Sequence, residues 1–104
     1  MPVKQYKPAR PADFDQLVDR LADEWKAPNS AAPEPVILEE ANPRGEVTHV
    51  YAVWSDWAHL SREVRGEILM DAAERVKPMT DVLKITIAMG LTPDEADRFG
   101  IKWR

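Results

Sequence analysis

The chain has 104 residues, of which 44% are hydrophobic and 31% charged, and it contains no cysteine. This size and composition are typical of one globular domain, and the lack of cysteine excludes disulfide bridges, thiolate metal sites and a cysteine nucleophile. The formal net charge is −4. An acidic body disfavours binding to the phosphates of nucleic acids over a broad surface.

The N-terminal segment differs in composition from the rest. Residues 1–11 contain three lysines or arginines and three prolines, and they are predicted to form a flexible basic arm before a single domain at 12–104. No apolar run resembles a signal peptide or is long enough to span a membrane. We therefore expect a cytoplasmic protein that does not bind membranes.

The first helix is predicted over residues 12–26. Its apolar residues recur at the spacing of one helical face. Asp13 is placed to cap the first turn, with Gln16 as the second member of a capping box. Residues 27–35 contain three prolines, which bar a helix and predict a stiff linker before a body at 36–104.

A β-hairpin is predicted next, with strands at 36–41 and 46–54. The connecting Asn42-Pro43-Arg44-Gly45 has the residue types of a type I turn, and Gly45 suits a positive φ. The second strand has apolar residues on both faces and is expected at the centre of the sheet. The first is expected at an edge, where self-pairing into a homodimer is an option.

The second half of the chain predicts two helices and one ambiguous segment. Ser61 is the expected N-cap of a helix that ends before Pro78. Residues 82–89 fit a strand or a helix, and the Ile-Thr-Ile run favours the strand. A last short helix begins at Thr92-Pro93, with Thr92 as the expected N-cap and Glu95 at the N3 position. Trp103 lies in a tail expected to fold back as an apolar latch or to anchor a partner.

The element order is α-β-β-α-β-α. It predicts an α+β two-layer sandwich, in which a three-stranded mixed sheet carries its helices on one face. The strand that follows the helical crossover is expected to lie parallel to its predecessor.

The segment HVYAVWSDWAHLSREVRGEILMDAAERV…LKITIAMGLTPDEA resembles the BolA family, whose fold is of the type II KH kind. The similarity covers about residues 36–98 and includes a His-led strand ending in Ser55-Asp56, a Leu-Ser helix start, a central arginine and a Thr-Pro helix start. The resemblance implies this topology.

The ligands that the family uses for iron–sulfur clusters, which it holds with glutaredoxin partners, have no match here. The family's histidine at the start of the last strand corresponds to a position near Leu83, and the hairpin loop has no His or Cys. The Gly-x-x-Gly loop of nucleic-acid-binding KH domains is also missing.

Functional candidates gather where the second strand meets the next helix. An aromatic patch there predicts a protein-binding surface, because tryptophan buries a large area at low entropic cost. Burial of Trp54 in the core and of Trp57 against a helix end is the competing interpretation. The candidate patch comprises Tyr51, Trp54, Asp56, Trp57, His59 and Trp103.

Catalytic and metal sites are poorly supported. Asp56 and His59 form a candidate acid–base pair without an accompanying nucleophile or oxyanion motif. A metal site would need His49 and His59 with a carboxylate, but His49 is better explained as a sheet residue. We therefore predict a non-catalytic interaction or adapter protein, without cofactor or metal, that binds above all another protein. The alternatives are a KH-like nucleic-acid binder using the basic arm and a small enzyme using Asp56 and His59.

Overall fold

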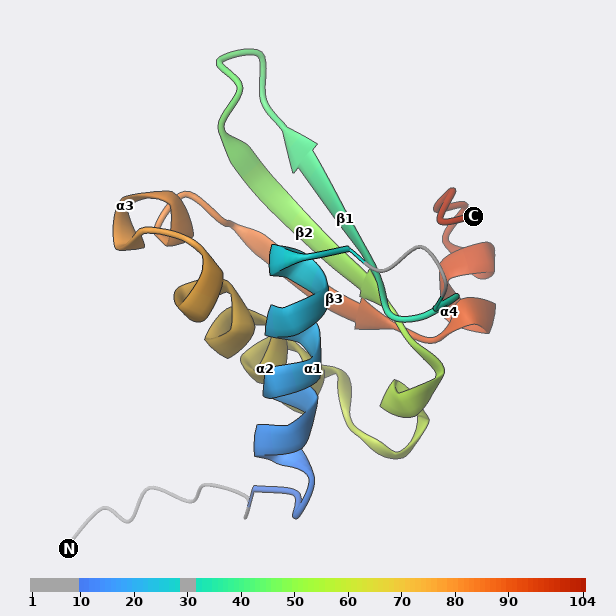
Figure 1. Ribbon diagram of the computed structural model, residues 1–104. Helices are drawn as coiled ribbons and strands as arrows, with labels where there is room; N and C mark the ends of the chain where they lie inside the picture. Colours follow the sequence, from blue (N-terminus) through green and yellow to red (C-terminus); the bar gives the residue numbers. More distant parts are fainter. Residues whose placement is uncertain (1–9, 29–31) are drawn as a thin grey trace, which may run out of the picture.

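The computed structural model of the chain describes residues 10–28 and 32–104. Most of the predicted basic arm and the middle of the proline-rich linker thus lie outside the described residues. The elements, shown in Figure 1, are α1 (Phe14–Lys26), β1 (Val36–Ala41), β2 (Val47–Val53), a 3₁₀ helix η1 (Ser55–His59), α2 (Arg62–Val76), α3 (Met79–Val82), β3 (Ile87–Leu91) and α4 (Pro93–Arg98).

The sheet has the strand order β1-β2-β3. β1 pairs antiparallel with β2, and β2 pairs parallel with β3. Gly45 adopts a φ of 83° in the hairpin turn, a conformation that costs glycine little. The predicted hairpin, the central second strand, the edge position of the first strand and the parallel crossover are therefore confirmed.

The two long helices cover one face of the sheet and form the main core with it. The apolar stripe predicted for the first helix is buried, and α2 buries Ile68, Leu69 and Ala72 against Val50 and Ala52 of β2. The predicted α+β sandwich with a three-stranded mixed sheet is therefore confirmed. However, α4 and the chain after it pack against one end of the other face, so the helices do not all lie on one face as predicted (Figure 1).

The segment 82–89 is not a strand along its length. α3 occupies Met79–Val82 and β3 begins only at Ile87. The amide of Ile85 still closes a turn onto α3 (3.1 Å), whereas that of Thr86 donates to a carbonyl of β2 (2.8 Å). The β-branched residues therefore adopt the extended conformation only where β2 offers a hydrogen-bond partner, and the first part of the segment belongs to the helical turn before them.

Two of the three predicted helix caps are present. The side chain of Ser61 accepts the amide of residue 64 (3.2 Å), and Thr92 forms a complete capping box with Glu95. Asp13 makes no side-chain cap, so the capping box predicted with Gln16 is wrong. The reason is conformational, because Asp13 has φ −96° and ψ 9° instead of the extended backbone of an N-cap.

Candidate interaction surface

The two tryptophans of the predicted aromatic patch lie in the core. Trp57 is 0% exposed and Trp54 is 6% exposed, and their rings meet edge to face at 5.1 Å. The indole N–H of Trp57 donates to the carbonyl of Ala52 (3.0 Å). A Cβ at Gly90 would lie 2.9 Å from the Trp57 ring, so the missing side chain makes room for the indole. Their assignment to a partner-binding patch is therefore wrong, because η1 folds Trp57 back into the interior.

A buried arginine next to these tryptophans is a residue that the predicted candidates did not include. Arg65 is 5% exposed. Its Nε donates to the carbonyls of Trp57 (3.1 Å) and Leu60 (3.0 Å), and its Nη1 donates to the carbonyl of Gly90 (3.2 Å). The same Nη1 donates to Glu95 Oε1 at 2.7 Å. One side chain therefore joins η1, α2, β3 and α4.

The carboxylate of Glu95 is held in its charged form. The pKa of Glu95 falls from 4.5 to about 2, first because the backbone N–H of Thr92 donates to it. Partial burial opposes this fall, and the Arg65 guanidinium contributes to it. The pair is structural, since these contacts hold the ends of four elements together. The signal was present in the sequence: a charged residue on the buried stripe of a helix requires a buried partner.

The remaining candidates on η1 do not form a catalytic pair. Asp56 and His59 are both exposed. His59 Nε2 lies 3.0 Å from the carboxylate of Asp13, at the start of α1, so its partner is not Asp56. Among the described residues, no group of three His, Cys, Asp or Glu side chains is placed to hold a metal ion.

The face of the sheet opposite α1 and α2, here called the outer face, consists of three rows across the strands. The strand register places Val36, Val53 and Leu91 in the first row, Leu38, Tyr51 and Met89 in the second, and Glu40, His49 and Ile87 in the third. Val53 and Leu91 of the first row are 0% exposed beneath Ala96 of α4. The second row is half-buried, and Ile87 of the third row is 39% exposed. Cover therefore decreases from one end of the outer face to the other.

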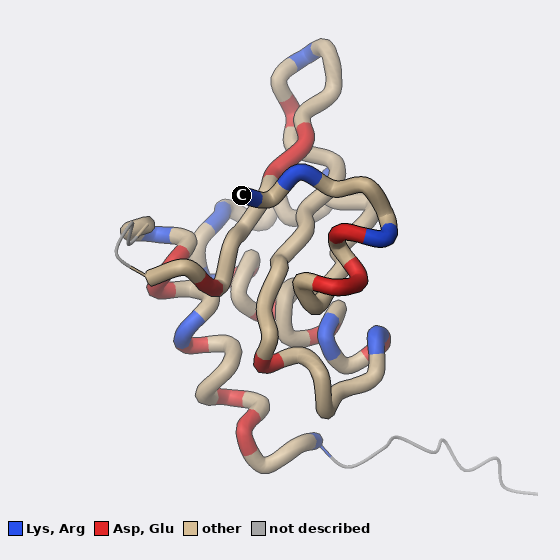
Figure 2. The backbone as a smooth tube through the Cα atoms, turned by 90° about the vertical axis from the view of Figure 1, so that its right-hand side faces the viewer, with Lys and Arg blue, Asp and Glu red and all other residues tan. Residues whose placement is uncertain are grey.

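Two predicted site residues meet at this face. Tyr51 and Trp103 belong to the same apolar cluster, and the predicted latch of the C-terminal residues is confirmed. The indole N–H of Trp103 donates to Asp97 of α4 (3.0 Å), which fixes the ring at the border of the open rows. Figure 2 views the molecule from this side, with the C-terminal segment in front and acidic positions along the hairpin.

His49 stands in the open third row. Its side chain is 30% exposed, and its Nδ1 lies 3.3 Å from Glu40 Oε1. That Nδ1 is buried and has no hydrogen-bond partner among the described residues. The rings of His49 and Tyr51 lie at a steep angle to each other, with their centroids 6.4 Å apart. A tyrosine ring and an imidazole ring thus lie next to each other on β2, at the outer face.

The two edges of the sheet differ. β3 is covered by α2: the carbonyl of Gly90 accepts from Arg65, and the carbonyl of Ala88 lies 3.4 Å from where a Cβ of Gly66 would stand. β1 pairs with a strand on one side only, as far as the described residues show. The C-terminal half of β1 is also exposed. The free edge of the sheet is therefore β1, and it borders the outer face.

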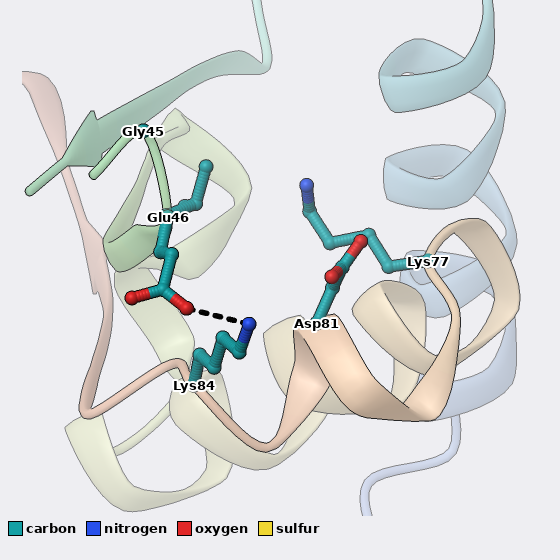
Figure 3. Close-up of a pocket in the computed structure, with 6 residues that line it drawn as sticks. Gly45, Glu46, Lys77, Asp81 and Lys84 are labelled. Atoms are coloured by element: carbon teal, nitrogen blue, oxygen red, sulfur yellow. Dashed lines mark ion pairs between the residues drawn. The ribbon is translucent and has the colours of Figure 1, made fainter.

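A small charged cavity lies between the hairpin and the corner from α2 to α3 (Figure 3). It has a volume of about 150 Å³ and is lined by Gly45, Glu46, Val47, Lys77, Asp81 and Lys84. Lys84 Nζ lies 2.5 Å from Glu46, and this contact lowers the pKa of Glu46 and raises that of Lys84. Lys77 is also paired, with Glu39 at 2.8 Å. The cavity is smaller than typical ligand pockets, and both of its lysines are already engaged.

Comparison with known proteins gives no family assignment. No family model, curated protein or solved structure matches this chain significantly. None of the helices in the described ranges is long and apolar enough to cross a membrane. A function can therefore be inferred only from the surface of the protein itself.

Proposed function

We propose that this protein is a small non-catalytic interaction protein that binds another protein through the outer face of its sheet. The observation that carries the proposal is the gradient of cover across the three rows. Half-buried apolar side chains, led by Tyr51 and Met89, continue into the exposed Ile87, on the face opposite α1 and α2. Apolar side chains that lie side by side and reach the surface mark an interaction site more often than scattered apolar residues do.

The chemistry of the face suits a protein partner. Tyr51 and His49 each offer a flat ring with a polar atom, and Met89 is an adaptable apolar side chain. Such residues favour contacts with other proteins. Nucleic acid is a poorer match, since the described part of the chain contains more acidic than basic residues.

The finer family assignment is also part of the proposal. The element order agrees with the topology that the BolA resemblance implies, and we propose a BolA-like, KH-like domain. Position 83 is leucine and the hairpin loop lacks His and Cys, so this domain would share the family's architecture without its cluster ligands.

Affinity capture from native lysate tests the function. Ile87→Ser removes the exposed apolar side chain of the third row. Leu83→Ser is the matched control, because Leu83 is 76% exposed but caps α3 and belongs to none of the three rows. We expect a protein captured by the wild type to be recovered equally with Leu83→Ser and reduced about fivefold or more with Ile87→Ser. Thermal unfolding of both variants verifies that they are folded.

Two results would contradict the proposal. One is equal recovery of every captured protein by the two variants, which would place the partner elsewhere. The other is capture of nucleic acid alone, lost as salt is raised, which would favour the KH-like alternative.

A further inference from the structure

We infer that the free edge of β1 accepts an extended, basic segment of the partner as an added strand. This inference rests on the proposed function and names the class of partner segment. An extended peptide that joins a sheet edge gains main-chain hydrogen bonds, while its alternate side chains contact the two faces.

The edge is structurally available. β1 is the outermost strand and β2 is its only partner within the described ranges. The opposite edge is closed by α2, as the contacts of Gly66 and Arg65 with β3 show. Strand addition is therefore possible at one edge, and that edge continues the open rows of the outer face.

A groove beside β1 provides room for the side chains of an added strand. It has a volume of about 360 Å³ and lies between the end of α1 and the first half of β1. Trp25, Val36 and Ile37 supply apolar lining, and Glu39 stands at one end. The Trp25 indole donates to Glu39 (3.2 Å), so the ring is held in place at the groove. One set of alternate side chains thus meets an indole and aliphatic groups.

The charge along the edge selects a basic segment. Glu39 and Glu40 are consecutive on β1, and both are exposed. Glu39 is paired with Lys77, whereas the side chain of Glu40 is 63% exposed and lies 3.3 Å from His49 Nδ1. A lysine or arginine on an added strand would stand across from these carboxylates, and opposite charges in such cross-strand pairs are favourable.

The same charges disfavour a second copy of this chain at the edge. Every antiparallel register that pairs most of β1 with itself puts two glutamates directly opposite or diagonally adjacent. Like charges in those positions destabilise strand pairing. Acidic residues on an edge strand therefore act against self-association and leave the edge open to a partner of opposite charge.

A titration of the ¹⁵N-labelled protein tests the inference. The probe is an acetylated and amidated peptide of about eight residues in which lysine alternates with valine. One control is the same peptide with glutamate in place of lysine. The other is the lysine–valine peptide with alternate amides N-methylated, which lacks the amide hydrogens that one edge of the peptide would donate to β1. Two protein variants with the same charge change complete the design: Glu40→Lys on β1 and Glu74→Lys on α2.

We expect shift changes and slowed amide exchange concentrated at 36–41 with the basic peptide. N-methylation and Glu40→Lys should each weaken binding about fivefold or more, and Glu74→Lys should change it less than about twofold. Equal binding of the N-methylated peptide, or shift changes confined to α1 and α2, would overturn strand addition. A wild-type dimer paired through β1 would do the same.

The result also separates this inference from the proposed function. If Ile87→Ser abolishes capture of the native partner but the basic peptide causes no shift changes at 36–41, the strand-addition inference fails and the proposed function stands.

Discussion

The carboxylate of Glu95, which accepts the Thr92 amide and pairs with Arg65, makes a quantitative prediction for the variant Glu95→Gln. Glutamine preserves the shape and an oxygen that can accept the Thr92 amide, but it removes the negative charge. In the folded protein the pKa of Glu95 is about 2 against an ordinary 4.5, a fall of about 2.5 pH units. That fall corresponds to about 3 kcal/mol of folding free energy at pH 7.

The pH dependence follows from the direction of the shift. Because the folded pKa is depressed, the contribution of Glu95 is fully present above pH 4.5 and is lost as the pH falls through about 2. At pH 3 it should have decreased to about 1 kcal/mol. The stability difference between wild type and Glu95→Gln should therefore shrink by about 2 kcal/mol from pH 7 to pH 3.

Urea unfolding followed by tryptophan fluorescence measures this difference, because Trp54 and Trp57 become exposed on unfolding. Glu74→Gln, on the exposed side of α2, is the control and should track the wild type at every pH. A Glu95→Gln difference that stays constant from pH 7 to pH 3 would refute the assignment of the stabilising charge to Glu95. So would a variant as stable as the wild type at pH 7.

Three further predictions concern packing and surface charge. Gly90→Ala puts a Cβ 2.7 Å from the Cβ of Arg65 and should lower the free energy of unfolding in urea by about 1–3 kcal/mol. Gly66→Ala, whose Cβ would have its nearest atom at 3.4 Å, should change it by less than about 1 kcal/mol. Equal effects of the two variants would mean that the close approach at β3 is absent. Trp57→Ala should lower the free energy of unfolding by about 3–5 kcal/mol. An unchanged thermal midpoint would mean that Trp57 lies at the surface and not in the core. Lys84→Met should raise the pKa of Glu46 toward its ordinary value, since Lys84 is the first cause of its depression; NMR of the Glu46 carboxyl carbon measures the shift, and an unchanged titration contradicts the ion pair.

The architecture was predictable because local signals agreed with one another. The cap at Ser61, the turn at Gly45 and the capping box at Thr92 mark element boundaries through short-range hydrogen bonds that the sequence encodes directly. β2 has apolar residues on both of its faces, which correctly predicted a central strand. At residues 82–89 the local signals for helix and strand competed. The conformation there depends on whether β2 is near enough to pair, and this is decided by the tertiary structure.

The functional surface was less predictable because burial of an aromatic residue depends on what stands opposite it. Trp57 is buried since Gly90, distant in sequence, leaves space for its ring. Tyr51 and Trp103 do lie together at the outer face. However, the row that contains the exposed Ile87 can be identified only when the strand register is known. The role of Arg65 likewise depends on carbonyls from two separate segments, residues 57–60 and Gly90, and on the carboxylate of Glu95.

Hydrogen–deuterium exchange with the native partner tests the central claim most directly. The protein is compared alone and in complex with the partner captured by the wild type, and the amides are read one by one. We predict that slowed exchange on binding is concentrated at 36–41 and in the rows of the outer face around Tyr51 and Ile87. Slowed exchange confined to the exposed sides of α1 and α2, with β1 unchanged, would contradict the account.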